Sequence, residues 1–301
     1  MNYETIHNNM IRGLHTLKLF QNTLVEYERC MELTECPSEK QIIYHNYNKI
    51  ENFDENWLKL GKIEFKNFSA KYREDTEIVL KKLNFIINPG EKVGIVGRTG
   101  SGKSTIALWL FRLIEAYEGS INIDDIDISL IPLEKLRKNI TIIPQDPVLI
   151  EGSLRFNIDP FNYYTNKQII EVIKKLKFDY IINKNPLGLE QIITEEGSNL
   201  SVGEKQLICI VRAILRKSKI IVMDEATANI DYKTEEIIQN SMNEIINKST
   251  IITIAHRLKT IINYDKIISL DNGEIIEFDT PRNLLKNENG IFYKLYNKSN
   301  L

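Results

Sequence analysis

The sequence lacks several features that would place it in other protein classes. No apolar run in its 301 residues approaches the roughly 18–20 residues needed to span a bilayer. Nothing near Met1 resembles a secretory signal peptide. The 39 basic and 41 acidic residues give a net charge of −2, so the chain has no basic surplus of the kind that nucleic-acid-binding domains carry. We therefore expect no nucleic-acid partner.

Cysteine is also scarce, since only Cys30, Cys36 and Cys209 are present. Their number is odd, their spacing fits no metal motif, and Cys209 sits in an apolar run with helical spacing. The sequence therefore predicts reduced thiols in the cytosol, not a disulfide framework or a zinc site.

The first of two regions covers residues 1–57. Apolar residues recur there at helical spacing, namely Ile6, Met10, Leu14, Leu17, Leu24, Tyr27 and Met31. The spacing predicts one long amphipathic helix that ends before Pro37, followed by a polar linker over residues 38–56. This region is too small to bury the apolar stripe by itself, so we expect the helix to pack on the second region or on a partner outside this sequence.

The second region covers residues 58–301 and alternates between strand and helix patterns. The expected strands cover residues 62–68, 83–87, 93–96, 219–223, 250–255 and 266–269, and the expected helices cover 233–246 and 257–262. This alternation predicts an α/β fold with a parallel sheet covered by helices. Residues 147–217 are mostly helical in pattern and are predicted to form a subdomain.

A glycine-rich segment at residues 97–104 matches the phosphate-loop pattern G-x-x-x-x-G-K-[ST] between a predicted strand and a predicted helix. Backbone N–H groups of such a loop surround phosphate oxygens, and the following helix N-terminus attracts their charge. Lys103 would reach the β- and γ-phosphates and Ser104 would hold Mg²⁺. The expected phosphate and Mg²⁺ contacts are Gly97, Arg98, Thr99, Gly100, Ser101, Gly102, Lys103, Ser104 and Thr105. The loop alone predicts only a nucleoside triphosphate ligand.

Two acids follow the apolar residues 220–223. Asp224 would then lie at the carboxyl edge of the sheet and hold Mg²⁺ through its hydration shell, while Glu225 would orient the attacking water. Acids also follow strands as ordinary surface or helix-capping residues, which is the alternative interpretation. A glutamate at this position favours a hydrolase over a passive ATP-binding module.

Residues 200–206 read Leu-Ser-Val-Gly-Glu-Lys-Gln, which resembles the ABC signature L-S-G-G-Q with changes at Val202 and Glu204. Other ABC elements follow in the family's order: the adenine-stacking aromatic at Tyr72, the Q-loop at Gln145, the D-loop at 228–231 and the H-loop at His256. With the segments 142–149 and 154–161, the valine-bearing signature looks like the second cassette of the C subfamily, the multidrug-resistance-associated type. The resemblance covers almost all of residues 58–301.

The resemblance implies a P-loop NTPase cassette with a parallel core sheet, an antiparallel β portion and a helical signature subdomain, preceded by a helix that ends a transmembrane domain. It implies ATP and Mg²⁺ as cofactors, with Gln145 completing the Mg²⁺ and water shell and Glu225 and His256 acting on the γ-phosphate side. A second cassette would pair head to tail, and Ser201 and Gly203 would contact its ATP. Transmembrane domains would be further partners, so the chain would lie at the cytosolic face of a membrane and meet the membrane only through them.

Glu204 has two interpretations. The spacing of Ser201 and Glu204 is that of a capping box, so the glutamate could serve only to cap the signature helix. Alternatively, its negative charge would lie near the partner's ATP and weaken that site. The sequence leaves both open.

These features predict ATP hydrolysis that powers export. A soluble ABC ATPase acting on DNA or the ribosome is disfavoured, because the chain has one cassette, no long heptad stretch and no basic surplus. The other alternative is a weak or regulatory ATP-binding fragment that needs a partner cassette. Because the second signature must come from another chain or an identical copy, we expect weak hydrolysis by the isolated chain.

Overall fold

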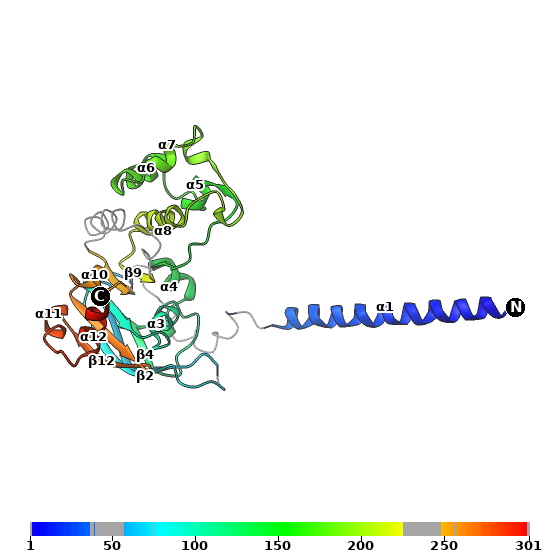
Figure 1. The fold of residues 1–301 in the computed structure, drawn as a ribbon, viewed down its shortest axis with the longest axis horizontal. Helices are drawn as coiled ribbons and strands as arrows, with labels where there is room; N and C mark the ends of the chain where they lie inside the picture. The colour runs from blue at the N-terminus through cyan, green and yellow to red at the C-terminus, as the bar shows by residue number, and fades with distance from the viewer. Residues whose placement is uncertain are drawn as a thin grey trace. The chain divides into compact units, whose positions relative to one another are not determined.

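The computed structural model describes residues 2–36, 39, 57–73, 75–224, 248–255 and 257–299. The chain divides into two compact units, Met1–Glu51 and Asn52–Leu301, and each is described by itself (Figure 1). The predicted linker at 38–56, apart from residue 39, and the predicted helix at 233–246 lie outside the described residues.

The first unit contains the helix α1, Tyr3–Glu35, which ends before Pro37 as predicted. Cys36 is extended, as the residue before a proline prefers to be. None of the helix residues is buried, and the apolar positions Met10, Leu14 and Leu17 are among those exposed. Within the described ranges, no helix combines the length and the apolar character that crossing a bilayer requires.

The second unit opens with an antiparallel sheet in the order β2-β1-β4-β5. Its strands are β1 (Ile63–Ala70), β2 (Leu80–Ile87), β4 (Glu118–Ile123) and β5 (Ile126–Asp127). The strands predicted at 62–68 and 83–87 are confirmed, and β2 begins three residues earlier than expected. Strand β4 was not expected, because only Ile121 and Ile123 alternate with polar residues there.

A second, six-stranded sheet has the order β12-β11-β3-β10-β9-β6, and only β12 runs antiparallel to its neighbour. Its strands are β3 (Lys92–Gly97), β6 (Ile140–Ile143), β9 (Ile220–Asp224), β10 (Thr250–Ile254), β11 (Lys266–Asp271) and β12 (Glu274–Asp279). The predicted parallel sheet is confirmed, whereas β6 and β12 were not expected. The first four residues of β9 are buried, as in a strand covered on both faces.

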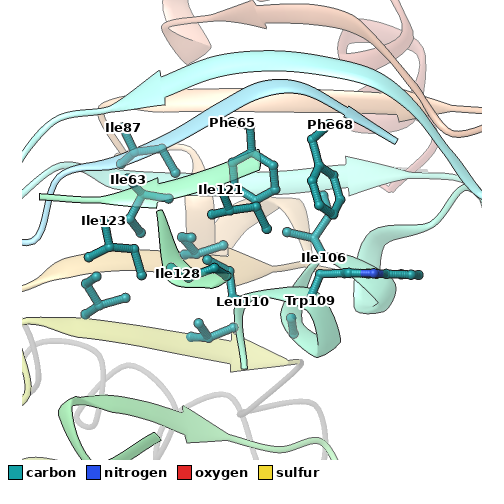
Figure 2. Packing of buried hydrophobic residues seen from close by; sticks show 14 of the residues in the cluster. Ile63, Phe65, Phe68, Ile87, Ile106, Trp109, Leu110, Ile121, Ile123 and Ile128 are labelled. Carbon is teal, nitrogen blue, oxygen red and sulfur yellow. The ribbon is translucent and has the colours of Figure 1, made fainter. Parts of the chain in front are cut away.

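Apolar side chains fill the space between the antiparallel sheet and α3, Lys103–Leu110. Figure 2 shows Phe68 of β1 close to Ile106 and Trp109 of α3, with Phe65 of β1 beside Ile121 of β4. The rings of Phe68 and Trp109 meet edge to face with centroids 6.2 Å apart. This packing fixes the helix that follows the phosphate loop.

A separate apolar core holds the helical subdomain, whose helices α5, α6, α7 and α8 lie together in Figure 1. They are α5 (Leu154–Ile158), α6 (Asn166–Lys175), α7 (Tyr180–Asn183) and α8 (Val202–Arg216). The predicted helical character of residues 147–217 is confirmed, with a small β7–β8 pair (Gly152–Ser153 and Ile192–Ile193) inside it. The signature helix α8 contributes ten buried residues to the unit.

Shorter helices are also present among the described residues of the second unit. They are α4 (Leu133–Asn139), α10 (Leu258–Ile261), α11 (Pro281–Leu284) and α12 (Ile291–Ser299), with 3₁₀ turns η1 (Ile128–Leu130), η2 (Gly188–Glu190) and η3 (Glu195–Gly197). The helix predicted at 257–262 is confirmed as α10.

Candidate functional site

The phosphate loop connects β3 to α3, as the sequence predicts. Gly102 is the N-cap of α3 with φ of 96°, a left-handed conformation that favours glycine. A Cβ at Gly97 would overlap the carbonyl oxygen of Leu270 on β11, so a side chain there would displace the neighbouring strand. Both glycines are therefore needed for the path of the loop.

Lys103 is buried under this loop and donates to the carbonyl oxygens of Gly97, at 2.9 Å, and Arg98, at 3.0 Å. The Ser101 hydroxyl is also buried and has no hydrogen-bond partner in the described part of the chain. A buried ammonium, an unsatisfied hydroxyl and a helix N-terminus within one loop suit a ligand rich in anionic oxygens.

Ser104 meets Asp224 across the sheet. Its Oγ donates to Asp224 Oδ1 at 3.5 Å, although the two residues are 120 positions apart. The topology explains this contact, since β3 and β9 both flank β10 and their carboxyl ends share one edge. A hydroxyl and a carboxylate are hard oxygen ligands of the kind that Mg²⁺ prefers. The donor set therefore fits Mg²⁺.

The Q-loop candidate Gln145 lies two residues beyond β6 and is exposed. Because β6 pairs in parallel with β9, with Ile143 beside Met223, this segment leaves the sheet at the same edge as Asp224. The structure thus brings the Q-loop candidate to the predicted side of the sheet. Its contacts to Mg²⁺ and water stay a prediction.

Tyr72 lies beside α3, the helix that follows the phosphate loop. Its hydroxyl shares a 3.0 Å hydrogen bond with Thr105 Oγ1, and its ring centroid is 5.6 Å from that of Trp109. The side chain is 46% exposed, so part of the ring remains open to a stacking ligand. The predicted adenine contact stays a prediction.

The signature begins α8. Ser201 is its N-cap and accepts the Glu204 N–H at 3.2 Å, while Glu204 Oε2 accepts the Ser201 N–H at 2.8 Å. The capping box predicted from the sequence is confirmed. Ser201 is exposed and Gly203 is partly buried, so this end of the helix is reachable from outside the subdomain.

Glu204 has a partner that was not predicted from the sequence, since Lys184 Nζ lies 2.6 Å from its other oxygen, Oε1. Burial alone would raise the pKa of Glu204, but the hydrogen bonds from Lys184 and Ser201 outweigh it and hold the pKa below its ordinary value. Glu204 is therefore an ionised and paired carboxylate. No local pattern could have revealed Lys184, because it is 20 residues away and follows a different helix, α7.

Gln206 is a second missed residue. It is buried, and its Nε2 donates to the carbonyl oxygen of Pro144, at 2.8 Å. This bond ties the signature helix to the segment immediately before Gln145. Gln206 directly precedes the apolar run at 207–211, and this position at the start of a buried stretch was the available signal.

Glu225, His256 and the D-loop candidate at 228–231 lie outside the described residues. The described residue before Glu225 is Asp224, the last residue of β9, and the one before His256 is Ala255, which directly follows β10. The two strands are parallel, and Ile254 pairs with Asp224. The predicted roles of Glu225 and His256 stay predictions.

Comparison with known proteins agrees with this geometry. Residues 80–228 match the family described as ABC transporter. Bile pigment transporter 1 of Saccharomyces cerevisiae is 45% identical over 302 residues, which cover 95% of this chain and 19% of the yeast protein. ATP-binding cassette sub-family C member 3 of Rattus norvegicus is 43% identical over 286 residues, which cover 95% of this chain and 18% of the rat protein.

A solved structure, that of a bacterial Atm1-family ABC exporter with ATP bound, matches with a TM-score of 0.83 and 30% identity. The match covers 93% of this chain and 48% of that exporter chain. The chain spans about a fifth of the length of the curated relatives, at 19% and 18% of those above. It belongs to the ABC transporter family and carries the nucleotide-binding domain, with members of the C subfamily among its relatives.

Proposed function

We propose that this chain binds Mg·ATP and hydrolyses it to ADP and phosphate, as the nucleotide-binding domain of an ABC exporter of the C-subfamily type. The contact between Ser104 and Asp224 carries the proposal, because it joins the phosphate loop to the acidic end of β9. The solved relative with ATP bound supports ATP as the nucleotide.

The phosphates would be held by the loop and α3. Lys103 would exchange the carbonyl oxygens of Gly97 and Arg98 for phosphate oxygens, and the hydroxyl of Ser101 would gain the partner that it lacks among the described residues. Ser104 and Asp224 would hold Mg²⁺, which neutralises charge on the phosphates when bound. Tyr72 would turn from Thr105 to the adenine ring.

Hydrolysis would proceed by in-line attack of water on the γ-phosphoryl group. Glu225 would orient and polarise the water, Gln145 would complete the shell around it, and His256 would contact the γ-phosphate. Catalysis would come mainly from positioning and charge neutralisation, since phosphoryl transfer needs little covalent help from the protein.

The remaining parts of the site would come from partners. A second cassette would pair head to tail, so that Ser201 and Gly203 of one cassette face the ATP of the other. Transmembrane domains would carry the cargo, and the cassette would lie at the cytosolic face of the membrane. Relatives that match 95% of the chain match much of residues 1–57, which supports assigning α1 to the end of a transmembrane domain.

Binding of a fluorescent ATP analogue to the full chain tests this proposal. Lys103→Met removes two charge-assisted contacts to phosphate and is expected to weaken binding by about 10- to 100-fold. Lys138→Met, at an exposed lysine of α4, is the matched control and should bind as the wild type does. Equal affinity in the Lys103 variant would refute the assigned nucleotide site.

Hydrolysis is tested separately. Glu225→Gln should retain ATP and accumulate an ATP-bound dimer, because water is no longer activated. The dimer is measured by size-exclusion chromatography, and phosphate release is measured alongside it. Undiminished phosphate release from this variant would refute the role of Glu225 while leaving ATP binding intact.

A weak or regulatory module that needs a partner cassette is the second candidate. It is favoured by the placement of the signature, which belongs to the helical core and not to the core around the phosphate loop. The rate of phosphate release per chain, measured at rising concentrations of the purified chain, decides between the two. A rate that is weak in dilute solution and rises as chains pair supports the enzyme, and a rate that stays low at every concentration supports the module.

A further inference from the structure

The carboxylate of Glu204 has both oxygens engaged. Oε2 accepts the N–H of Ser201 at 2.8 Å, and Oε1 lies 2.6 Å from Lys184 Nζ. The Glu204 side chain is 11% exposed, whereas that of Lys184 is 41% exposed. The glutamate is thus enclosed at the first turn of α8, and the lysine covers its outer oxygen.

Lys184 is held for this contact by the helical subdomain. It is the C-cap of α7, and its N–H donates to the carbonyl oxygen of Tyr180. Gln191 Nε2 donates to the Ile181 carbonyl at 2.8 Å and ties α7 to the segment after η2. The ammonium group therefore reaches the signature from a separate, anchored element.

The N-terminus of α8 and the carboxylate of Glu204 carry charges of opposite sign. The N-terminus of α8 carries partial positive charge from its backbone N–H groups, which attracts anions. An acid in the first turn stabilises the helix but offsets that attraction for an arriving phosphate. A cation 2.6 Å from the acid restores the balance, because the pair is neutral and the helix dipole remains.

We propose that Lys184 is a positioning residue of the signature, which neutralises Glu204 so that the N-terminus of α8 accepts the γ-phosphate of ATP bound to a partner cassette. The inference rests on the proposed function, since it requires a partner's ATP at Ser201. It also decides between the two interpretations of Glu204: the residue caps the helix, and its charge does not weaken the partner's site because Lys184 masks it.

The test uses the full chain with Mg²⁺ and ATPγS, which is hydrolysed slowly. Analytical ultracentrifugation measures nucleotide-dependent self-association, and a fluorescent ATP analogue at low protein concentration measures binding within one chain. Lys184→Met should weaken self-association about tenfold and leave binding within one chain unchanged. Lys184→Arg should retain association, and the double variant Lys184→Met with Glu204→Gln should regain it, because no bare carboxylate is left.

Lys175→Met is the matched control, because Lys175 and Glu171 form a similar pair, 2.9 Å apart, on α6 of the same subdomain. This variant should associate as the wild type does. Wild-type association in Lys184→Met, or no recovery in the double variant, overturns the role of Lys184. A wild-type chain that binds the analogue but never associates also overturns it. Failure of the wild type to bind the analogue instead overturns the proposed function.

Discussion

The two helix N-termini that would meet phosphate are built differently. At α3 the N-cap is Gly102, with no side-chain cap and no acid in the first turn. At α8 the N-cap is Ser201, with a complete capping box and Glu204 in the first turn. Because the first N–H groups of a helix need acceptors, α3 leaves them to a ligand, whereas α8 satisfies two donors from its own side chains.

The first turns of α3 and α8 also differ in how far they are buried. Lys103 and Thr105 in the first turn of α3 are buried, whereas Ser201 and Val202 at the start of α8 are exposed. The end of α3 suits a ligand enclosed by its own cassette, and the end of α8 suits one presented from outside. Changes at α3 should therefore affect binding within one chain, and changes at α8 should affect stability and association.

The largest expected effect comes from the carboxylate beside α3. Asp224→Asn keeps the shape but removes the charge that would hold the Mg²⁺ shell, so hydrolysis should fall about 10- to 100-fold. Phosphate release at varied Mg²⁺ concentration measures it, and added Mg²⁺ should recover part of the rate. Asp125→Asn changes an exposed acid in a turn and is the control. A normal Mg²⁺ dependence in Asp224→Asn would remove Asp224 from the metal site.

The next largest effect is expected from a substitution at Gly102, the N-cap of α3. Gly102→Ala forces an alanine to φ of 96° and brings its Cβ to 2.7 Å from Leu80 Cδ2, at a cost of about 1–2 kcal/mol. Because that strain falls on the loop, affinity for the ATP analogue should drop about tenfold. Gly90→Ala has a similar φ of 77° with nothing within 4 Å of its Cβ. It should lose stability without losing affinity, and equal affinity losses would contradict the comparison.

The contrast also explains what the sequence could predict. The phosphate loop is contiguous, so its glycines, Lys103 and Ser104 could be identified from spacing alone. Asp224 was also predicted, because a buried apolar strand leads directly to it. Lys184 and Gln206 were missed, since their contacts to Glu204 and Pro144 join segments 20 and 62 residues apart through the tertiary fold.

Two strands were not predicted from the sequence for a similar reason, because their structure depends on distant parts of the chain. β12 is partly exposed and pairs at the edge of the sheet, so its sequence Glu-Ile-Ile-Glu-Phe-Asp lacks a continuous apolar run. β6 has only four residues and could not be separated from the loop that follows it. Both short and edge strands take their structure from neighbours that a local pattern does not contain.

A smaller effect is expected at the capped helix. Ser201→Ala removes the N-cap acceptor of α8 and should lower the free energy of unfolding by about 1 kcal/mol. Thr165→Ala removes the equivalent cap of α6, which also has a complete capping box, and should cost about the same. Thermal unfolding compares the two. Only Ser201→Ala should also weaken ATPγS-dependent self-association. If both variants lost self-association to the same extent, Ser201 would act only as a structural cap.

The smallest effect concerns the acid dependence of the α8 end. The pKa of Glu204 is lowered in the folded chain, so its ionised form adds stability above the ordinary value of 4.5, and this is lost as pH falls through the lower folded value. Urea unfolding measures the free energy of unfolding at about pH 7 and at about pH 3. Between these pH values, Glu204→Gln should lose about 0.5 kcal/mol less free energy of unfolding than the wild type, which is the size expected for a partly exposed ion pair. Glu134→Gln, at an exposed residue of α4, should follow the wild type. Parallel curves for wild type and Glu204→Gln would mean that Lys184 does not hold the carboxylate in solution, and the two helix ends would then differ only in their caps.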